Sequence, residues 1–539
     1  MNNKPGFDCY PEHIATDIEI PNKSLPQILQ DTTKGYPTNI ALSFYHKEIT
    51  YTELSMAVGA FASALQQKGI NKGDRVAIML PNCPQYVISF YGALTVGGVV
   101  TQVNPMLVER ELQHILKDSG AETIVIFDAL YPRFKAIQSE TTIKNVIVVS
   151  LQPTEHSFEP DQVFDHFLRS GNGKVSYVEI NSMEDVAVLQ YTGGTTGRSK
   201  GAMLTHRNLV ANIAQCVEFF KDDFTFGQEC FLTVIPMFHV FGMTACMNFA
   251  IYTGANSIML PRFELEEVLN TIKEKKPTIF PGVPTMYVAI TNHPEAEKYG
   301  IDSIRMCNSG SAPMPVELLR EFERKTGARI LEGFGLSEAS PVTHCNPLFA
   351  ERKPGTVGIG YPSTEYKVVD LADGIHEVPP GELGELIIRG PQIMKGYWNM
   401  PEETANTLRN GWLFTGDIAR MDDEGYVSIV DRKKDMIIAG GFNIYPRDIE
   451  EILYEHPSVQ EAVAVGVPDE YRGETVKVVL VLKAGKEATE QEIMLYCKEN
   501  MSAYKVPTIV EFRTELPKTN VGKILRRVIK EENNTKQTN

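Results

Sequence analysis

Between about residue 50 and residue 340, short strand-like apolar runs alternate with longer amphipathic segments, and this alternation constrains the fold more than any other feature of the chain. The short runs are RVAIML at 75–80, ETIVIF at 122–127, NVIVVS at 145–150, FLTVI at 231–235, NSIML at 256–260 and TIFPGV at 278–283. The segments at 52–69, 109–120 and 265–276 space their apolar residues as amphipathic helices do. The pattern predicts an α/β fold in which mostly parallel sheets are covered by helices.

The sequence pattern changes beyond residue 355, where short strand-like runs are separated by predicted turns rich in Gly, Pro and Asp. We expect a small β-rich subdomain at about 355–431, which completes a large N-terminal domain of residues 1–431. Residues 432–539 alternate strands with helical segments at 446–456 and 491–500, and they predict a separate α+β domain. A length of 539 residues is consistent with several domains.

The charge and the cysteines exclude several classes of function. A formal net charge of −16 argues against broad binding to nucleic acid or to an anionic membrane surface. The 8 cysteines are scattered without a C-x-x-C pair, so neither a zinc site nor a disulfide framework is indicated. The first residues carry acids and prolines where a signal peptide needs a basic start and an apolar run. We therefore expect a cytoplasmic protein.

Residues 230–261 contain no Asp, Glu, Lys or Arg, and their length alone would suffice for a membrane span. Proline, glycine and asparagine residues interrupt the stretch, however. We expect a strand, a short helix and a second strand buried in an α/β domain, and no transmembrane span.

The segment YTGGTTGRSKGAMLTH at 191–206 combines glycines, hydroxyl side chains and two cations after a strand-like run. Glycines let backbone N–H groups turn toward an anion, hydroxyls add donors and a lysine adds a point charge, so the segment predicts a polyphosphate site. We expect a helix to continue from this loop, because a helix N-terminus would strengthen such a site. The spacing does not match G-x-x-x-x-G-K-[S/T], and a flexible surface loop is the alternative explanation.

Five motifs in the same order resemble those of the adenylate-forming superfamily of acyl-CoA synthetases, luciferases and peptide-synthetase adenylation domains. They are the loop at 192–201, GFGLSE at 333–338, TGD at 415–417, DRKK at 431–434 and PKTNVGKILR at 517–526. The resemblance extends from about residue 35 to residue 527, and residues 410–446 look most like bacterial long-chain fatty acid–CoA ligases.

The resemblance implies a two-step reaction of a fatty acid of medium to long chain with ATP and coenzyme A, supported by Mg²⁺. The carboxylate attacks the α-phosphorus of ATP to give acyl-adenylate and pyrophosphate, and the thiol of coenzyme A then displaces AMP. An aryl- or short-chain acyl-CoA ligase is the nearest alternative. A non-catalytic nucleotide- or acyl-binding protein is the alternative from another class. A homodimer and transient peripheral contact with a membrane both stay open.

The resemblance also assigns the ATP-binding roles. The β- and γ-phosphates are expected to be held by Thr192, Thr195, Thr196 and Lys200. Glu338 is expected to bind Mg²⁺, and Ser337 to touch the α-phosphate. The adenine is expected to be lined by Gly333, Phe334 and Gly335 and, on its other face, by Gly310, Ser311 and Ala312. Asp417 and Arg432 are expected to bind the ribose. Phe334 replaces the Tyr of most relatives, which keeps the ring and loses a hydroxyl.

By the same resemblance, the C-terminal domain is mobile and rotates between the two half-reactions about a hinge at 431–435, with Lys434 at the pivot. Before rotation, Lys523 would bridge the carboxylate and the α-phosphate. After rotation, Gly440 and Gly441 would line the tunnel for the pantetheine of coenzyme A. His239 would orient the carboxylate at the mouth of an apolar acyl tunnel walled by residues 240–247, into which we expect Gly242 to face. The residues expected to act in catalysis are Lys523, Glu338, His239, Thr196 and Lys200.

Each assignment has a plainer structural alternative. An aromatic residue between glycines is often only packed, and an Asp in a tight turn often caps its own backbone. A lone histidine in an uncharged stretch is more often a core residue than a catalyst, and DRKKD would serve as a charged hairpin turn. Without the resemblance, the cations at 518–530 would be a basic tail for nucleic acid, which the acidic chain makes less suitable.

Overall fold

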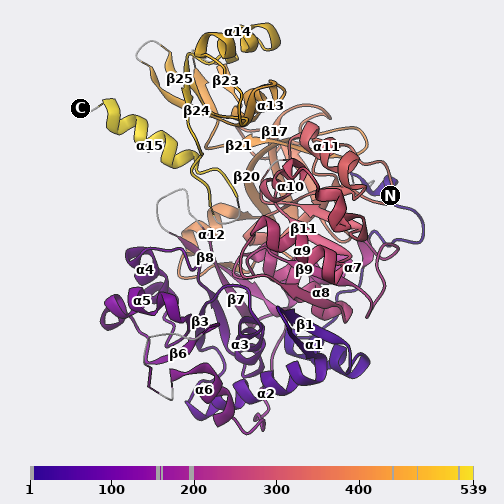
Figure 1. Ribbon diagram of the computed structural model, residues 1–539, viewed down its shortest axis with the longest axis vertical. Coiled ribbons are helices and arrows are strands. Elements are labelled where there is room, and N and C mark those ends of the chain that lie inside the picture. The colour runs from indigo at the N-terminus through magenta and orange to yellow at the C-terminus, as the bar shows by residue number, and fades with distance from the viewer. Residues whose placement is uncertain are drawn as a thin grey trace.

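The computed structural model describes residues 5–152, 158–159, 162–192, 199–312, 314–439, 442–469, 472–519 and 522–537. Two large sheets with their helices fill most of the molecule, and the C-terminal strands and helices lie together at one end of its long axis (Figure 1). The expected α/β architecture is confirmed.

The first large sheet has the strand order β18-β8-β7-β4-β3-β5-β6. Its parallel strands are β3 (Arg75–Met79), β4 (Val99–Gln102), β5 (Thr123–Phe127), β6 (Asn145–Val149) and β7 (Val186–Thr192). Two antiparallel strands complete one edge, namely β8 (Lys200–Thr205) and β18 (Gly396–Tyr397). The edge strand β18 therefore comes from a part of the chain far from the rest of the sheet.

The second large sheet has the order β15-β14-β13-β12-β11-β9-β10-β1-β2. Its parallel part consists of β1 (Ile40–Phe44), β9 (Cys230–Thr233), β10 (Asn256–Met259), β11 (Ile279–Gly282), β12 (Met306–Ser309) and β13 (Ile330–Gly335). Antiparallel strands close both edges, namely β2 (Lys47–Thr50), β14 (Val342–Cys345) and β15 (Ile359–Gly360).

The amphipathic segments predicted at 52–69, 109–120 and 265–276 are confirmed as helices. In chain order, the helices of this region are α1 (Leu25–Gly35), α2 (Tyr51–Gln67), α3 (Pro84–Thr95), α4 (Glu109–Ser119), α5 (Tyr131–Ile137), α6 (Phe164–Ser170), α7 (His206–Phe219), α8 (Phe249–Thr253), α9 (Leu265–Lys275), α10 (Pro284–Asn292) and α11 (Val316–Thr326). Helix α2 shows why: Thr50 and Glu53 form a capping box at its start, and Leu54, Val58 and Phe61 repeat at helical spacing and are buried.

Two smaller sheets complete the chain. The first combines β16 (Glu365–Val369), β17 (Gly384–Arg389), β19 (Leu408–Arg409), β20 (Trp412–Met421) and β21 (Val427–Arg432), with α12 (Pro401–Thr407) between β18 and β19. The second combines β22 (Ile437–Ala439), β23 (Phe442–Ile444), β24 (Val459–Asp469), β25 (Gly473–Leu482) and β26 (Ile509–Phe512). Its helices are α13 (Pro446–Tyr454), α14 (Glu490–Asn500) and α15 (Arg526–Gln537).

The helix expected after the segment 191–206 is confirmed, but the last residues of that segment form a strand and not part of a loop. Residues 200–205 form β8, which pairs antiparallel with β7, and α7 begins only at His206 after the cap residue Thr205. The continuous run GAML at 201–204 suits a largely buried strand that has a partner on both sides. Any phosphate site in this loop is therefore at the turn of a hairpin and not at the start of a helix.

The uncharged stretch 230–261 does contain the expected strand, short helix and second strand. Between β9 and β10 lie a π-helical segment, η5 (Gly242–Asn248), and α8. Among the described residues, none of the helices is both long enough and apolar enough to cross a membrane.

Candidate functional site

Asp417 and Arg432 face each other across the antiparallel pair β20–β21. Arg432 donates from Nε to Oδ1 of Asp417 at 2.7 Å. Asp417 is only 2% exposed, and its other oxygen, Oδ2, has no hydrogen-bond partner in the described part of the chain. Burial raises the pKa of Asp417, while Arg432 opposes that shift. A buried acceptor without a partner is rare, and this one is suited to a hydroxyl group of a ligand.

Lys523 closes a tight turn that begins at Thr519, just before α15. The N–H of Thr519 donates to the carbonyl of Lys523 at 2.8 Å, and the N–H of Leu525 donates to that of Pro517 at 2.8 Å. Gly522 has φ +72°, and a Cβ there would lie 2.6 Å from Oγ1 of Thr285 at the start of α10. Only glycine combines this backbone conformation with so close an approach. The turn is therefore seated against the large domain.

Lys523 keeps part of its surface in contact with solvent. Protein atoms nevertheless lie around its side chain, and cationic side chains are among them. Desolvation lowers its pKa to about 8, and the charges of Arg432 and Lys434 act in the same direction while Asp417 opposes them. The pKa of His239 falls to about 4 through burial and through the charge of Lys523. The structure thus brings Lys523, Asp417, Arg432, Lys434 and His239 into one electrostatic neighbourhood.

Glu338 belongs to the same neighbourhood, because its charge acts on both Asp417 and Arg432. It lies in a short 3₁₀ turn, η8 (Ser337–Ala339), after β13. The hydroxyl of Tyr397 donates to its Oε1 at 2.7 Å, and Nζ of Lys200 lies 5.2 Å from the Tyr397 ring centroid. Lys200 also forms an ion pair with Glu403 of α12. The site therefore joins a carboxylate, a phenol and an ammonium group.

Tyr397 and Glu403 were not among the residues expected from the sequence. The local signal was the aromatic tripeptide GYW at 396–398. It becomes informative only when β18 is seen to pair with β8, which carries Lys200.

Of the two segments expected to line adenine, 310–312 directly follows β12, and 333–335 forms the end of the neighbouring strand β13. A Cβ on Gly310 would lie 3.3 Å from the Phe241 ring, and Ser311 adopts an unusual φ of +68°. The Phe334 ring lies 6.2 Å from that of His344. A Cβ on Gly335 would lie 2.4 Å from the Pro341 carbonyl, so this glycine is required for packing.

Of the other residues expected in the site, some lie beside those described above and some fall outside the described residues. Thr192 pairs with Lys200 at the end of the β7–β8 hairpin that carries the connecting loop, so both residues lie where that loop begins and ends. Ser337 begins η8 next to Glu338, and Ala312 follows Ser311. Thr195, Thr196, Gly440 and Gly441 lie outside the described residues.

Gly242 does not face an acyl tunnel as expected. A Cβ at this position would lie 2.3 Å from the carbonyl oxygen of Pro236 and 2.8 Å from that of Ile235. The backbone of the preceding turn thus occupies the space into which a side chain at position 242 would extend. A large residue here would break that turn before it could block any tunnel.

No group of three or more His, Cys, Asp or Glu side chains arranged for a metal occurs in the part of the chain that the structure describes. Glu338 is a single carboxylate, held by Tyr397. Mg²⁺ commonly binds through one or two carboxylates together with substrate phosphates, so this donor set fits Mg²⁺ that arrives with a nucleotide.

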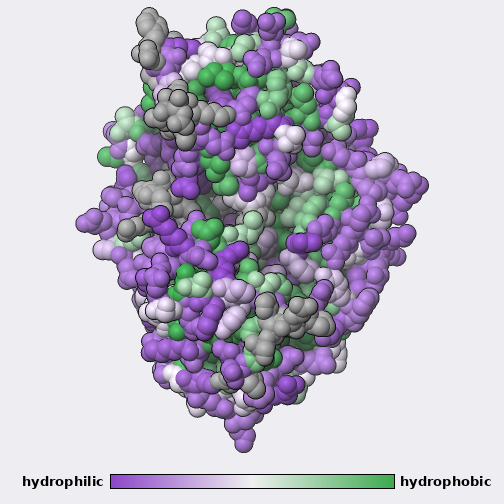
Figure 2. Space-filling view, turned by 60° about the vertical axis from the view of Figure 1, so that its left-hand side comes forward, coloured by the Kyte–Doolittle hydropathy of each residue, from purple (hydrophilic) through white to green (hydrophobic). Residues whose placement is uncertain are grey.

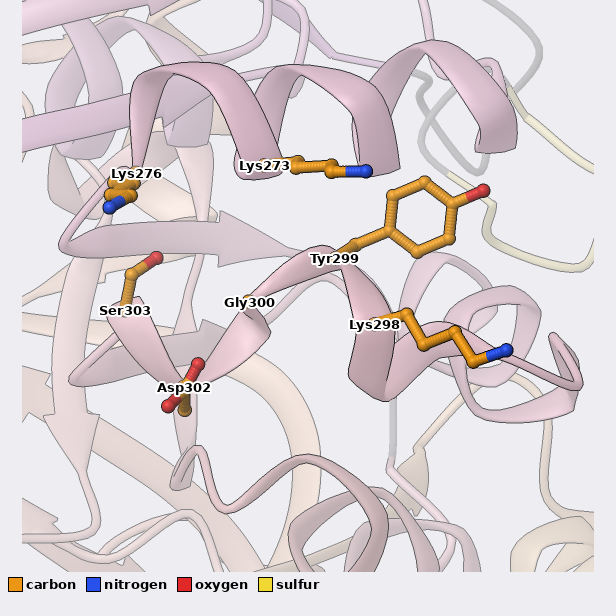
Figure 3. A pocket seen from close by; sticks show the side chains of 7 residues that line it. All are labelled: Lys273, Lys276, Lys298, Tyr299, Gly300, Asp302 and Ser303. Atoms are coloured by element: carbon orange, nitrogen blue, oxygen red, sulfur yellow. The ribbon is translucent and has the colours of Figure 1, made fainter.

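Hydrophilic residues cover most of the molecular face in Figure 2, and a hollow crosses its middle. A separate surface pocket of about 390 Å³ lies between α9 and the short turns at 296–303 (Figure 3). Its lining residues are Lys273, Lys276, Lys298, Tyr299, Gly300, Asp302 and Ser303, none of which belongs to the site described above.

Known proteins resemble this chain along nearly its whole length. Residues 29–398 match the family described as AMP-binding enzyme, and residues 448–523 match the AMP-binding enzyme C-terminal domain. A long-chain-fatty-acid–CoA ligase of Bacillus subtilis is 45% identical over 553 residues, covering 99% of this chain and 98% of that protein. One of Escherichia coli O6:H1 is 38% identical over 557 residues, covering 98% of each. The crystal structure of ATP-bound MatB from Rhodopseudomonas palustris has a TM-score of 0.87 at 29% identity, covering 95% of this chain and 99% of that one.

Proposed function

Because the chain belongs to the family of AMP-binding enzymes, we propose that it activates a fatty acid of medium to long chain with ATP and transfers the acyl group to coenzyme A. The observation that carries this proposal is that Lys523 lies close enough to Asp417 and Arg432 for their charges to shift its pKa. A cation from the C-terminal domain and an acceptor from the large domain thus share one site.

In the first half-reaction, an oxygen of the fatty carboxylate attacks the α-phosphorus of ATP and the bond to pyrophosphate breaks. Asp417 accepts hydrogen bonds from the ribose through Oδ2, and Arg432 keeps the Asp417 carboxylate oriented. Lys523 places its positive charge between carboxylate and α-phosphate, where negative charge concentrates. Preorganised charges of this kind are the largest catalytic contribution in many enzymes.

The phosphates of ATP are held by Lys200 and by the loop that starts after Thr192. Glu338 would hold Mg²⁺, and the bound ion would supply positive charge to balance that of the departing pyrophosphate. Tyr397 orients the Glu338 carboxylate by its hydrogen bond. His239 is uncharged near pH 7 because its pKa is low, so it orients the carboxylate of the fatty acid without competing with Lys523 for the negative charge.

For the second half-reaction, we propose that residues 432–539 rotate as a domain against residues 1–431, with the β-rich subdomain at about 355–431 moving with the large domain. The hinge is at 431–435, between β21 and β22. Rotation withdraws Lys523 from the site and admits coenzyme A, whose thiol attacks the acyl carbon while AMP departs. We propose that this chemistry takes place in the cytoplasm.

The fatty acyl substrate follows from the relatives' names and from the apolar surroundings of His239. Val240, Met243, Cys246 and Met247 are all at most 2% exposed and carry no charge. An apolar chain bound among such residues contributes about 0.8 kcal/mol per buried methylene. Each added pair of carbons should therefore improve apparent affinity by about tenfold until the site is full.

A substrate series tests the proposal. The purified chain is assayed for acyl-CoA formation with saturated acids from butyrate to stearate and with coumarate, at fixed ATP, Mg²⁺ and coenzyme A. We expect kcat/KM to rise steeply with chain length and then level off. A flat profile, or a preference for coumarate, would reject the fatty acyl substrate in favour of the aryl or short-chain alternative.

A further inference from the structure

Lys200 has an anionic partner inside the protein. Its ammonium group forms an ion pair with the carboxylate of Glu403, and the two side chains are 15% and 39% exposed. On the same side, the Tyr397 ring lies 5.2 Å from Nζ of Lys200. The ammonium group is therefore largely enclosed, whereas the carboxylate can turn out toward water.

The backbone holds Glu403 close to Lys200. Strand β18 pairs with β8, and the N–H of Trp398 donates to the carbonyl of Gly201 at 2.8 Å. The hydroxyl of Thr404 accepts the N–H of Tyr397 at 2.8 Å, which fastens α12 to β18. Figure 1 shows α12 beside β8. The pair thus belongs to the architecture of the sheet edge and does not depend on two long side chains meeting by chance.

A largely enclosed ammonium group requires an anion, because burying an unpaired charge is unfavourable. Glu403 supplies that anion before a nucleotide is present. When the phosphates of ATP reach Lys200, they meet a carboxylate of the same sign on the same cation. The two anions cannot both hold the ammonium group at full strength, and mutual repulsion favours the release of Glu403 into water.

We propose that Glu403 is a positioning residue that occupies Lys200 in the nucleotide-free enzyme and competes with ATP for it. This inference rests on the proposed function, since Lys200 must be a phosphate-binding residue. Glu403 holds the Lys200 ammonium group beside the Tyr397 ring, and it sets ATP affinity below the value that Lys200 alone would give. Ion pairs of this partly exposed kind are weak enough to be displaced by a polyphosphate.

The opposite role for Glu403 makes the opposite prediction. If Glu403 turned with Glu338 toward the Mg²⁺ that accompanies ATP, removal of its charge would weaken nucleotide binding. The direction of the change in affinity therefore separates a competitor from a ligand.

The test compares the full-length wild-type chain with Glu403→Gln and Glu403→Ala by calorimetric titration with a non-hydrolysable ATP analogue and Mg²⁺. We expect both variants to bind about 3- to 10-fold more tightly. Glu402→Gln is the matched control, because Glu402 is the adjacent, exposed residue of α12. We expect its affinity to equal that of the wild type. A second measurement, the increase in Tm on adding the analogue, should be larger for Glu403→Gln than for the wild type.

Unchanged or weaker binding by both Glu403 variants would overturn the proposal. An equal gain in Glu402→Gln would also overturn it, because the effect would then come from general charge and not from the ion pair. A wild-type chain that binds no analogue at all would instead refute the proposed function. These failures are distinguishable, since only the last concerns the wild type.

Discussion

The pKa of Lys523 makes adenylate formation sensitive to pH. Desolvation and the nearby charge of Arg432 lower this pKa to about 8. In the proposed mechanism, Lys523 acts on the carboxylate and the α-phosphate only when it is protonated. We therefore expect kcat/KM for the first half-reaction to be high near pH 7 and to fall as pH rises through about 8.

The size of the fall follows from the pKa. At about pH 9, roughly one molecule in eleven still carries the proton, so kcat/KM should be about tenfold lower than at about pH 7. Lys523→Ala removes the charge at every pH, and loss of one preorganised donor typically lowers a rate by about 10² to 10³. Thioester formation from supplied acyl-adenylate should change little in this variant, because the proposed rotation makes Lys523 serve only one orientation of the C-terminal domain.

Pyrophosphate exchange measures the first half-reaction without coenzyme A, whose thiol would add its own titration. We expect the exchange kcat/KM, followed from about pH 6.5 to about 9.5, to report the pKa of the free enzyme. Lys523→Arg is the matched control, because a guanidinium stays protonated over the whole range and should abolish the fall near pH 8.

Two results would refute this reasoning. One is a wild-type profile that stays flat to about pH 9.5. The other is an identical fall in Lys523→Arg and Lys523→Ala, which would assign the titration to another group. Equal loss of both half-reactions in Lys523→Ala would contradict the proposed domain rotation.

Three further variants test other parts of the site. Asp417→Asn keeps the size of the side chain and removes its charge, so the KM for ATP should rise by about 10- to 100-fold in exchange assays; an unchanged KM would exclude a role in binding ribose. Lys434→Pro should spare pyrophosphate exchange and block transfer to coenzyme A, because proline fixes the φ angle at the hinge; loss of exchange in a folded variant would count against the hinge. Glu332 is 6% exposed and accepts the N–H of Gly355 at 3.0 Å, and burial raises its pKa from 4.5 to about 7. The native state then binds more protons than the unfolded state between these values, so stability falls as pH rises through that window. Glu332→Gln should therefore raise the free energy of unfolding by up to about 3 kcal/mol above pH 7 and leave it unchanged below about pH 4.5; calorimetric Tm values at both pH values measure this, and an equal effect at both would show that the charge is not responsible.

The sequence by itself determined the α/β architecture and most of the elements. Runs such as 75–80 and 122–127 became strands β3 and β5, and 109–120 and 265–276 became helices α4 and α9. These predictions succeed because periodicity is local: a strand alternates every two residues and a helix repeats every 3.6. The residues around Asp417 and Lys523 were identified because their motifs resemble those of a known family. Such a resemblance indicates which distant residues come together in the fold, whereas periodicity does not.

Only the tertiary structure decided which residues meet. Residues 200–205, which were expected to belong to the phosphate loop, form a strand because β7 and β18 offer hydrogen-bonding partners on both sides. Glu403 reaches Lys200 from 203 residues away, across a pairing that no local pattern encodes. Likewise, nothing in the sequence around Gly242 indicates that the Pro236 carbonyl lies where a Cβ at position 242 would be. Strand pairing and close contact depend on the free energy of the whole assembled sheet, and so these features are settled by packing between distant segments and not by the residues that flank them.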